Sequence, residues 1–199
     1  MINRRTFFYD VRVKLFGGRL DQRQVDGMNA VLDEWEKRGL TELRWLAYAL
    51  ATAFWETAHT MWPIEEWGKG QGHPYGVPDP ATAQVYYGRG FVQLTWKSNY
   101  ATMGRLLGID LVSHPEKALE LPVATQILFE GMMRAESRIG DFTGLALDDC
   151  FNATHDDWVR ARAIVNGTDH AAAIADIGRT FYAAIQQAET GNQNQRKAA

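Results

Sequence analysis

The sequence contains little of what marks disulfide-stabilised, thiol-dependent or zinc-dependent proteins. It has a single cysteine, Cys150, which excludes an intramolecular disulfide framework. Two aspartates, Asp148 and Asp149, come directly before it, and their negative charge disfavours a reactive thiolate. We therefore expect Cys150 to be structural. The five histidines are scattered without a metal-binding spacing, so we expect no metal and no other cofactor.

Long apolar runs and clustered basic residues are also missing. No apolar run approaches the roughly 18 residues that a membrane-spanning helix needs, so no membrane insertion is expected. The net charge of −3 argues against nucleic acid as a partner, because phosphate binding requires clustered lysine and arginine. Charged residues interrupt positions 1–17 before an apolar signal core could form, which predicts synthesis in the cytoplasm.

The chain does contain enough apolar residues for one substantial core. They make up 46% of 199 residues, which predicts a single domain over residues 1–190, followed by a flexible polar tail at 191–199. Apolar spacing and end signals predict helices over residues 21–39, 41–56, 98–108, 122–137, 156–167 and 171–188. Residues 63–85 are rich in proline and glycine and predict a long functional loop. The expected fold class is mainly α with little β.

Residues 86–100 have the composition of a sugar-binding segment. Aromatic side chains alternate with amides and hydroxyls, and sugars bind both, through ring stacking and through hydrogen bonds. Gly88 and Gly90 allow backbone to approach a ligand closely. The alternative interpretation is a tight turn that leads into a buried strand.

Carboxylates upstream favour the sugar-binding interpretation. Glu56 lies near the carboxyl end of the predicted helix 41–56, above small side chains that leave room for a ligand. Glu65 and Glu66 follow about ten residues later across a turn, where either could face Glu56 over a cleft. Glycosidases use such a pair: one carboxyl group protonates the leaving oxygen and the other activates water or attacks the sugar. The alternative for Glu56 is an ordinary solvated glutamate.

Three segments resemble the family 19 glycoside hydrolases, which include plant-type chitinases and many bacteriophage endolysins. They are residues 54–58, 63–66 and 87–95 with the adjoining Asn99 and Tyr100. The third carries the specific pattern Tyr-Gly-Arg-Gly-x-x-Gln-Leu-Thr, and the similarity extends from residue 21 to residue 185. The resemblance implies a lysozyme-like, mainly α-helical fold, with a substrate cleft between two lobes.

The resemblance also implies roles for individual residues. Glu56 would be the general acid, and Thr95 would help to hold the attacking water. Glu66 occupies the Pro-Ile-x-Glu position of the second carboxylate, while counting from the first glutamate in some relatives selects Glu65 instead. The expected substrate contacts are Gln93, Asn99 and Asn166, with Tyr87 and Arg89 shaping the cleft; an internal ion-pair role for Arg89 is an equal alternative.

The combined expectation is a phage-type endolysin that hydrolyses the β-1,4 glycosidic bond of peptidoglycan. Such an enzyme would be made in the host cytoplasm, reach the cell wall after holin-dependent release and act as a monomer. A chitinase, acting on another GlcNAc-containing polysaccharide, is the alternative. Ser98 stands where chitinases often have an aromatic residue, and secreted plant-type relatives have disulfides, so peptidoglycan is preferred. A lytic transglycosylase and a non-catalytic glycan-binding wall protein remain open.

Overall fold

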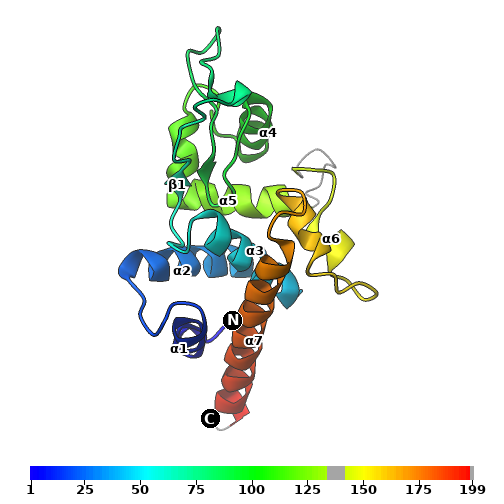
Figure 1. Ribbon diagram of the computed structural model, residues 1–199. Coiled ribbons are helices and arrows are strands. Elements are labelled where there is room, and N and C mark those ends of the chain that lie inside the picture. Colours follow the sequence, from blue (N-terminus) through cyan, green and yellow to red (C-terminus); the bar gives the residue numbers. More distant parts are fainter. Residues whose placement is uncertain (134–141, 198–199) are drawn as a thin grey trace.

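The computed structural model describes residues 1–133 and 142–197, with side chains described up to residue 189 (Figure 1). The described residues form a mainly α-helical structure, which confirms the predicted fold class. The α-helices are α1 (Arg4–Lys14), α2 (Gln22–Lys37), α3 (Leu43–Glu56), α4 (Lys97–Leu107), α5 (Leu121–Met132), α6 (Leu147–Cys150) and α7 (Ala171–Lys197). Short 3-10 helices cover Pro74–Gly76, Pro115–Leu119 and Arg160–Ile164.

The small β-structure joins the two segments that carry the candidate site. Strand β1 (Ile64–Glu65) pairs antiparallel with β2 (Arg89–Gly90), with Ile64 opposite Gly90 and Glu65 opposite Arg89. The chain between them, residues 66–88, is irregular apart from the 3-10 turn at Pro74–Gly76. This agrees with the loop predicted over residues 63–85, except that Ile64 and Glu65 pair with β2 as strand β1.

Local chemistry accounts for the ends of the first predicted helices. At the start of α2, the Asp21 carboxylate accepts the Gln24 amide proton at 2.8 Å, and the Gln24 side chain accepts the Asp21 amide proton at 3.0 Å. This capping box satisfies two amides that a helix start leaves unpaired. Gly39 follows the helix with φ +65°, a left-handed conformation that glycine adopts without strain. The start of α3 differs from the prediction, because Glu42 rather than Thr41 is the N-cap residue.

Three other predicted segments also differ from the structure. The helix expected over 156–167 is only the 3-10 turn Arg160–Ile164: the Asp157 carboxylate accepts the Arg160 amide proton at 2.9 Å, as a helix N-cap does, but the segment continues in the 3-10 form that is common in short connections. The helix predicted to reach residue 137 ends at Met132, and residues 134–137 lie outside the described residues. The tail expected at 191–199 is helical through Lys197, since glutamine, arginine and lysine continue a helix readily.

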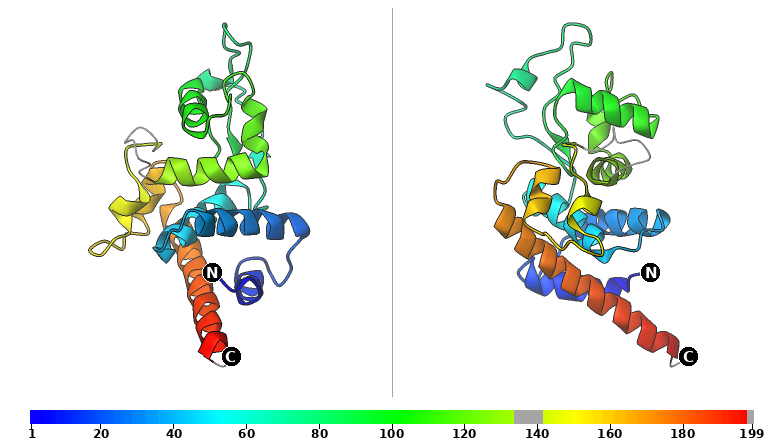
Figure 2. Two further views of the ribbon diagram at one scale, coloured as in Figure 1. Left: turned by 180° about the vertical axis from the view of Figure 1, so that it is seen from behind. Right: turned by 90° about the vertical axis from the view of Figure 1, so that its right-hand side faces the viewer.

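The elements form two parts, with α5 lying between them (Figure 1). The lower lobe comprises α1, α2, α3 and α7, and the upper lobe comprises the strand pair, the loop 66–88 and α4. Figure 2 shows the same separation from behind and from the side. In the lower lobe α3 packs along α7 and against α2, and its residues from Leu46 to Phe54 are all buried. This rigid core fixes the carboxyl end of α3, where Glu56 lies.

Cys150 is buried at the end of α6. Burial is the main cause that raises the pKa of its thiol to about 11, so the thiolate is scarce at neutral pH. This agrees with the predicted structural role. Within residues 1–133 and 142–197, no three histidine, cysteine, aspartate or glutamate side chains gather as metal ligands would. None of the helices in that part of the chain is both long and apolar enough to cross a membrane.

Gly27 on α2 is a position where a single methyl group should destabilise the fold. A Cβ atom there would lie 1.6 Å from the backbone oxygen of Met61, and backbone cannot move aside cheaply. Glycine-to-alanine changes within helices usually stabilise, but we expect Gly27→Ala to lower the free energy of unfolding by about 1–3 kcal/mol through overpacking. Urea denaturation measures the change. Asn29→Ala on the same helix is the control for helix propensity, and equal stability of both variants would contradict this packing argument.

Candidate functional site

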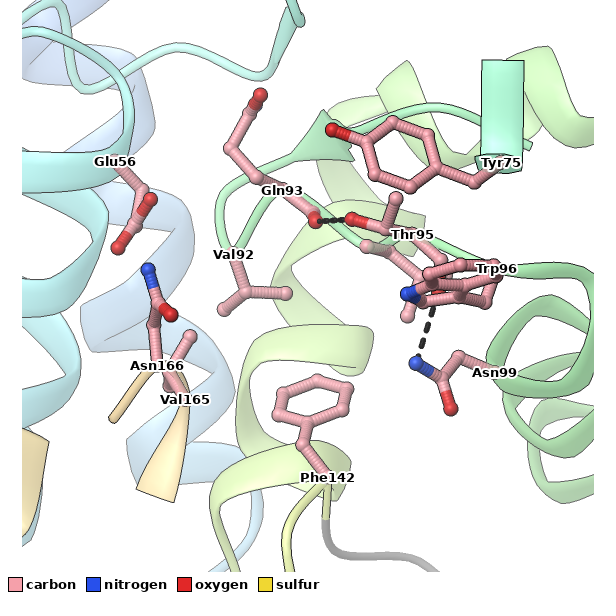
Figure 3. A pocket seen from close by; sticks show the side chains of 11 residues that line it. Glu56, Tyr75, Val92, Gln93, Thr95, Trp96, Asn99, Phe142, Val165 and Asn166 are labelled. Atoms are coloured by element: carbon pink, nitrogen blue, oxygen red, sulfur yellow. Dashed lines mark hydrogen bonds between the residues drawn. The ribbon is translucent and has the colours of Figure 1, made fainter. Parts of the chain in front are cut away.

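A pocket of about 460 Å³ opens between the end of α3 and residues 92–99 (Figure 3). Its volume is within the range of about 300–1,000 Å³ that is typical of small-molecule sites. It brings together one carboxylate, several amides and hydroxyls, and apolar or aromatic side chains. The lining residues are Glu56, Tyr75, Val92, Gln93, Leu94, Thr95, Trp96, Asn99, Phe142, Val165 and Asn166.

A buried arginine holds Glu56 on one wall of this pocket. The Arg162 Nη1 atom donates to Glu56 Oε1 at 2.5 Å, and Arg162 Nε donates to the backbone oxygen of Asp169 at 3.1 Å. The Arg162 side chain is only 3% exposed, so it cannot turn away into solvent. Among the described residues no protein group donates to Glu56 Oε2. The ion pair therefore fixes the carboxylate and leaves one oxygen available to a ligand.

Asn166 and Thr95 supply polar groups on two sides of the pocket. The Asn166 amide points toward Glu56, whereas Thr95 lies on the opposite wall beside Tyr75 and Trp96 (Figure 3). The Thr95 hydroxyl donates its one proton to the backbone oxygen of Gln93 at 2.7 Å. Its lone pairs remain free to accept a hydrogen bond, as a water-holding group must.

Asn99 is fixed behind Thr95 at the start of α4. Its Nδ2 atom donates to the Thr95 backbone oxygen at 2.8 Å, which leaves the amide oxygen as an acceptor at the pocket wall. The structure thus brings four of the predicted site residues into one pocket with Gln93: Glu56, Thr95, Asn99 and Asn166.

Two pocket residues have backbone conformations that are rare outside glycine. Gln93 has φ +52° and Trp96 has φ +73°, and such conformations cost on the order of 1–3 kcal/mol each. The Gln93 amide nitrogen donates to the backbone oxygens of Ile64 (3.2 Å) and Gly90 (3.3 Å), which holds the turn in place. Its predicted contact with sugar is therefore limited to the remaining amide oxygen.

Glu66 is held beside the pocket rather than in its lining. Its Oε1 accepts the Tyr75 hydroxyl proton at 3.0 Å, and its Oε2 accepts the Gly88 amide proton at 2.9 Å. Tyr75 itself lines the pocket, so one phenol links the second carboxylate to the wall opposite Glu56. A Cβ atom on Gly88 would lie 2.8 Å from Gln93 Oε1 and 3.4 Å from Glu66 Cβ, so this close approach requires glycine.

Glu65 is held by a different set of groups. Tyr87 donates to Glu65 Oε1 at 2.6 Å, and Lys69 Nζ lies 2.8 Å from Oε2. These bonds, the one from Lys69 first, lower the pKa of Glu65. Tyr75, which lines the pocket, donates to Glu66, whereas Glu65 accepts from Tyr87, which does not line it. The contacts therefore favour Glu66, and its role stays a prediction.

Tyr87 and Arg89 do not line the pocket. Arg89 is 5% exposed and donates to the backbone oxygen of Val85 at 3.1 Å and to the Tyr100 hydroxyl at 3.0 Å. Its guanidinium carbon lies 3.6 Å from the centre of the Tyr87 ring. No carboxylate forms an ion pair with Arg89 among the described residues. Both residues thus support the strand pair from inside, and the predicted ion-pair role is replaced by bonds to neutral oxygens.

Sequence reasoning missed Arg162, Tyr75 and Trp96. Arg162 is buried, whereas Arg160, two residues earlier, is exposed. Alanine follows both arginines, and nothing in the neighbouring sequence shows which of the two is buried. Tyr75 lies in a proline- and glycine-rich loop whose path could not be predicted. Trp96 was visible as an aromatic residue beside Thr95, but its place at the wall depends on its unusual backbone conformation.

Part of the chain is similar in sequence to known proteins. Residues 71–133 match the glycoside hydrolase family 19 model, described as chitinase class I. The inactive chitinase-like protein 1 of Hevea brasiliensis is 34% identical over 85 residues, which cover 34% of this chain and 27% of that protein. Chitinase 8 of Oryza sativa subsp. japonica is 56% identical over 36 residues, covering 18% of this chain and 14% of that protein. The matches span less than a third of the length of these relatives.

A solved structure shares the fold over most of the chain. Chitinase C from Streptomyces griseus HUT6037 superposes with a TM-score of 0.56 at 19% identity, covering 93% of this chain and 76% of that one. This likeness confirms the predicted lysozyme-like, mainly α-helical fold.

Proposed function

We propose that the chain is a family 19 glycoside hydrolase that hydrolyses β-1,4 glycosidic bonds in peptidoglycan, a proposal supported by the family match of residues 71–133 and by the shared fold. The observation that carries this proposal is the fixed carboxylate of Glu56, which lies across one pocket from the Thr95 hydroxyl. A proton donor and a water-holding group on opposite walls are what hydrolysis of a sugar bond by two carboxylates needs.

In this mechanism Glu56 is the general acid, and its available oxygen donates a proton to the leaving glycosidic oxygen. The attacking water is held by the lone pairs of the Thr95 hydroxyl and gives its proton to Glu66. The Tyr75 hydroxyl and the Gly88 amide hold the Glu66 carboxylate in place for this step. The chain itself supplies both the acid and the base.

Other pocket residues would bind the sugar rings. The Asn99 amide oxygen can accept a hydrogen bond from a sugar hydroxyl, and the Asn166 amide can form a hydrogen bond with a ring substituent near Glu56. The partly exposed Trp96 ring offers a face on which a sugar can stack. These contacts suit a GlcNAc-containing polysaccharide.

The finer assignment is a phage-type endolysin that acts as a monomer on the cell wall after holin-dependent release. Ser98 in place of an aromatic residue and the single cysteine favour peptidoglycan over chitin. Chitin is the second candidate substrate, because the matched relatives and the superposed structure carry chitinase names. A non-catalytic glycan-binding protein is the alternative from another class, and one relative is named inactive. The presence of Glu56, Glu66 and Thr95 favours catalysis.

The substrate is tested by comparing rates on purified peptidoglycan and on GlcNAc hexamers under the same conditions. We expect the catalytic efficiency on peptidoglycan to be higher by about tenfold or more, which corresponds to about 1.4 kcal/mol of transition-state preference. Faster cleavage of the hexamers would assign the enzyme to chitin. No cleavage of either polymer would leave only the glycan-binding alternative.

The second carboxylate is tested by two neighbouring substitutions. Glu66→Gln should lower the rate of hydrolysis by about 10²- to 10⁴-fold, because the group that accepts the proton from water is lost. Glu65→Gln is the matched control and should change the rate by less than about tenfold. The partners of Glu65, Lys69 and Tyr87, lie outside the pocket lining, so its contacts hold local structure and do not transfer a proton. The opposite ranking of the two variants would assign the role to Glu65.

A further inference from the structure

A second pocket of about 260 Å³ adjoins the one that contains Glu56. The two pockets share Tyr75 and Trp96, so these aromatic rings form the wall between them. The rings meet edge to face, with their centres 5.2 Å apart. The volume of the second pocket is below the range of about 300–1,000 Å³ typical of whole small-molecule sites. It therefore suits a substituent that branches from a bound chain better than further sugars of that chain.

The second pocket is largely apolar, with the paired side chains of Lys97 and Asp79 in its lining. Val77 and Pro78 contribute to the apolar part of this lining, and Lys97 contributes a positive charge. Such a lining is suited to methyl groups and short aliphatic segments. A sugar ring, with a hydroxyl on almost every carbon, would leave many of its polar groups without partners there.

The charge of Lys97 remains accessible although the lysine is paired. Its Nζ atom lies 2.8 Å from Asp79 Oδ1, and that same oxygen accepts bonds from the amides of Ala81 and Thr82 at 3.1 Å. The Asp79 charge is thus shared among several donors. The Lys97 side chain is 41% exposed, and an ammonium group has three donors. Lys97 can therefore bind a carboxylate of a ligand without losing Asp79.

We propose that the second pocket binds the lactyl-peptide stem of a muramoyl residue. The lactyl and alanyl methyl groups would contact Val77 and Pro78, and a stem carboxylate would pair with Lys97. This inference rests on the proposed function and deepens it, since the stem distinguishes peptidoglycan from chitin. A glycan bound in the Glu56 pocket would pass its substituent across the wall formed by Tyr75 and Trp96.

Binding to the Glu56→Gln protein tests the proposal without turnover. The ligands are a peptidoglycan tetrasaccharide that carries alanyl-glutamate stems and, as the stemless ligand, a GlcNAc tetrasaccharide, which has neither lactyl nor peptide groups. We expect the stem-bearing ligand to bind about tenfold more tightly by calorimetry, because a charge-assisted hydrogen bond and apolar contacts are added. Equal affinity of the two ligands would overturn the proposal.

Two substitutions locate the preference in the second pocket. Lys97→Met removes the cation, and Val77→Trp fills the space from a position that is largely exposed and should tolerate the change. Each should reduce the difference between the ligands to less than about threefold while leaving the affinity for the stemless tetrasaccharide unchanged. Lys37→Met, a lysine on α2 outside both pockets, is the control for lost charge. A preference that survives both pocket variants would place the stem elsewhere.

The binding experiment and the test of the catalytic role of Glu56 can fail independently of each other. If Glu56→Gln still hydrolyses peptidoglycan at the wild-type rate, the assignment of the acid fails whatever the stem does. If Glu56→Gln is inactive but binds both ligands equally, the catalytic proposal stands and the stem pocket is rejected.

Discussion

Replacing Glu56 with glutamine is expected to lower the rate of peptidoglycan hydrolysis by about 10²- to 10⁴-fold. Glutamine has the same shape and can still accept the hydrogen bond from Arg162, but it cannot donate a proton to the leaving oxygen. The folded structure should be preserved, so KM should change much less than kcat. Initial rates of release of soluble muropeptides from purified walls measure both.

A surface glutamate provides the control for this substitution. Glu116→Gln removes the same charge from an exposed position in the 3-10 turn Pro115–Leu119 and should leave the rate unchanged. If Glu56→Gln releases muropeptides as fast as the wild-type protein, Glu56 is not the acid and the pocket is not the catalytic site.

Replacing Arg162 with methionine should affect both stability and activity. Removing one partner of a buried ion pair leaves the other charge uncompensated and costs about 3–5 kcal/mol, and the opening of the pocket beside Glu56 favours the lower end. The freed carboxylate also loses its orientation, and a displacement of about 1 Å can cost about 10²-fold in rate. Urea denaturation measures the first effect and steady-state kinetics the second.

The kinetic pattern separates a positioning role for Arg162 from a purely structural one. We expect kcat to fall while KM stays close to the wild-type value, because sugar contacts on the opposite wall remain. Arg160→Met, two residues earlier and exposed, is the matched control and should change neither stability nor rate. A wild-type kcat for Arg162→Met would show that Glu56 does not depend on the ion pair.

Helices with strong local signals could be predicted from the sequence. Asp21 and Gln24 form the expected capping box, and Gly39 ends α2 in the expected left-handed conformation. The segment after Asp157 could not be, because its apolar spacing and N-cap bond are those of an α-helix, whereas the structure has only the short 3-10 turn Arg160–Ile164. Helix α1 was not predicted, because among its residues only Phe7 and Val11 are buried and the apolar pattern is short.

Some residues of the candidate site could likewise be predicted from the sequence, and others could not. The resemblance placed Glu56, Thr95, Asn99 and Asn166 together, and the pocket contains all four. The ion pair from Arg162 could not be predicted, since it depends on a contact between α3 and a turn more than a hundred residues later. Such long-range pairs leave no periodicity in the sequence.

Residues 86–100 satisfy both interpretations that their composition allowed. Arg89, Tyr87 and Tyr100 form a buried support, as a turn leading into a strand would. Gln93, Thr95, Trp96 and Asn99 line the pocket, as a sugar-binding segment would. The division follows the backbone, because the positive φ angles of Gln93 and Trp96 turn the second half toward the pocket.

Mass spectrometry of the products made in ¹⁸O water tests the central claim most directly. Hydrolysis by Glu56, Thr95 and Glu66 should release saccharides from peptidoglycan whose new reducing ends each carry one ¹⁸O atom. Products that end in 1,6-anhydro sugars without ¹⁸O would instead show an intramolecular transglycosylase reaction, in which Glu66 is dispensable, and would contradict the proposed hydrolysis.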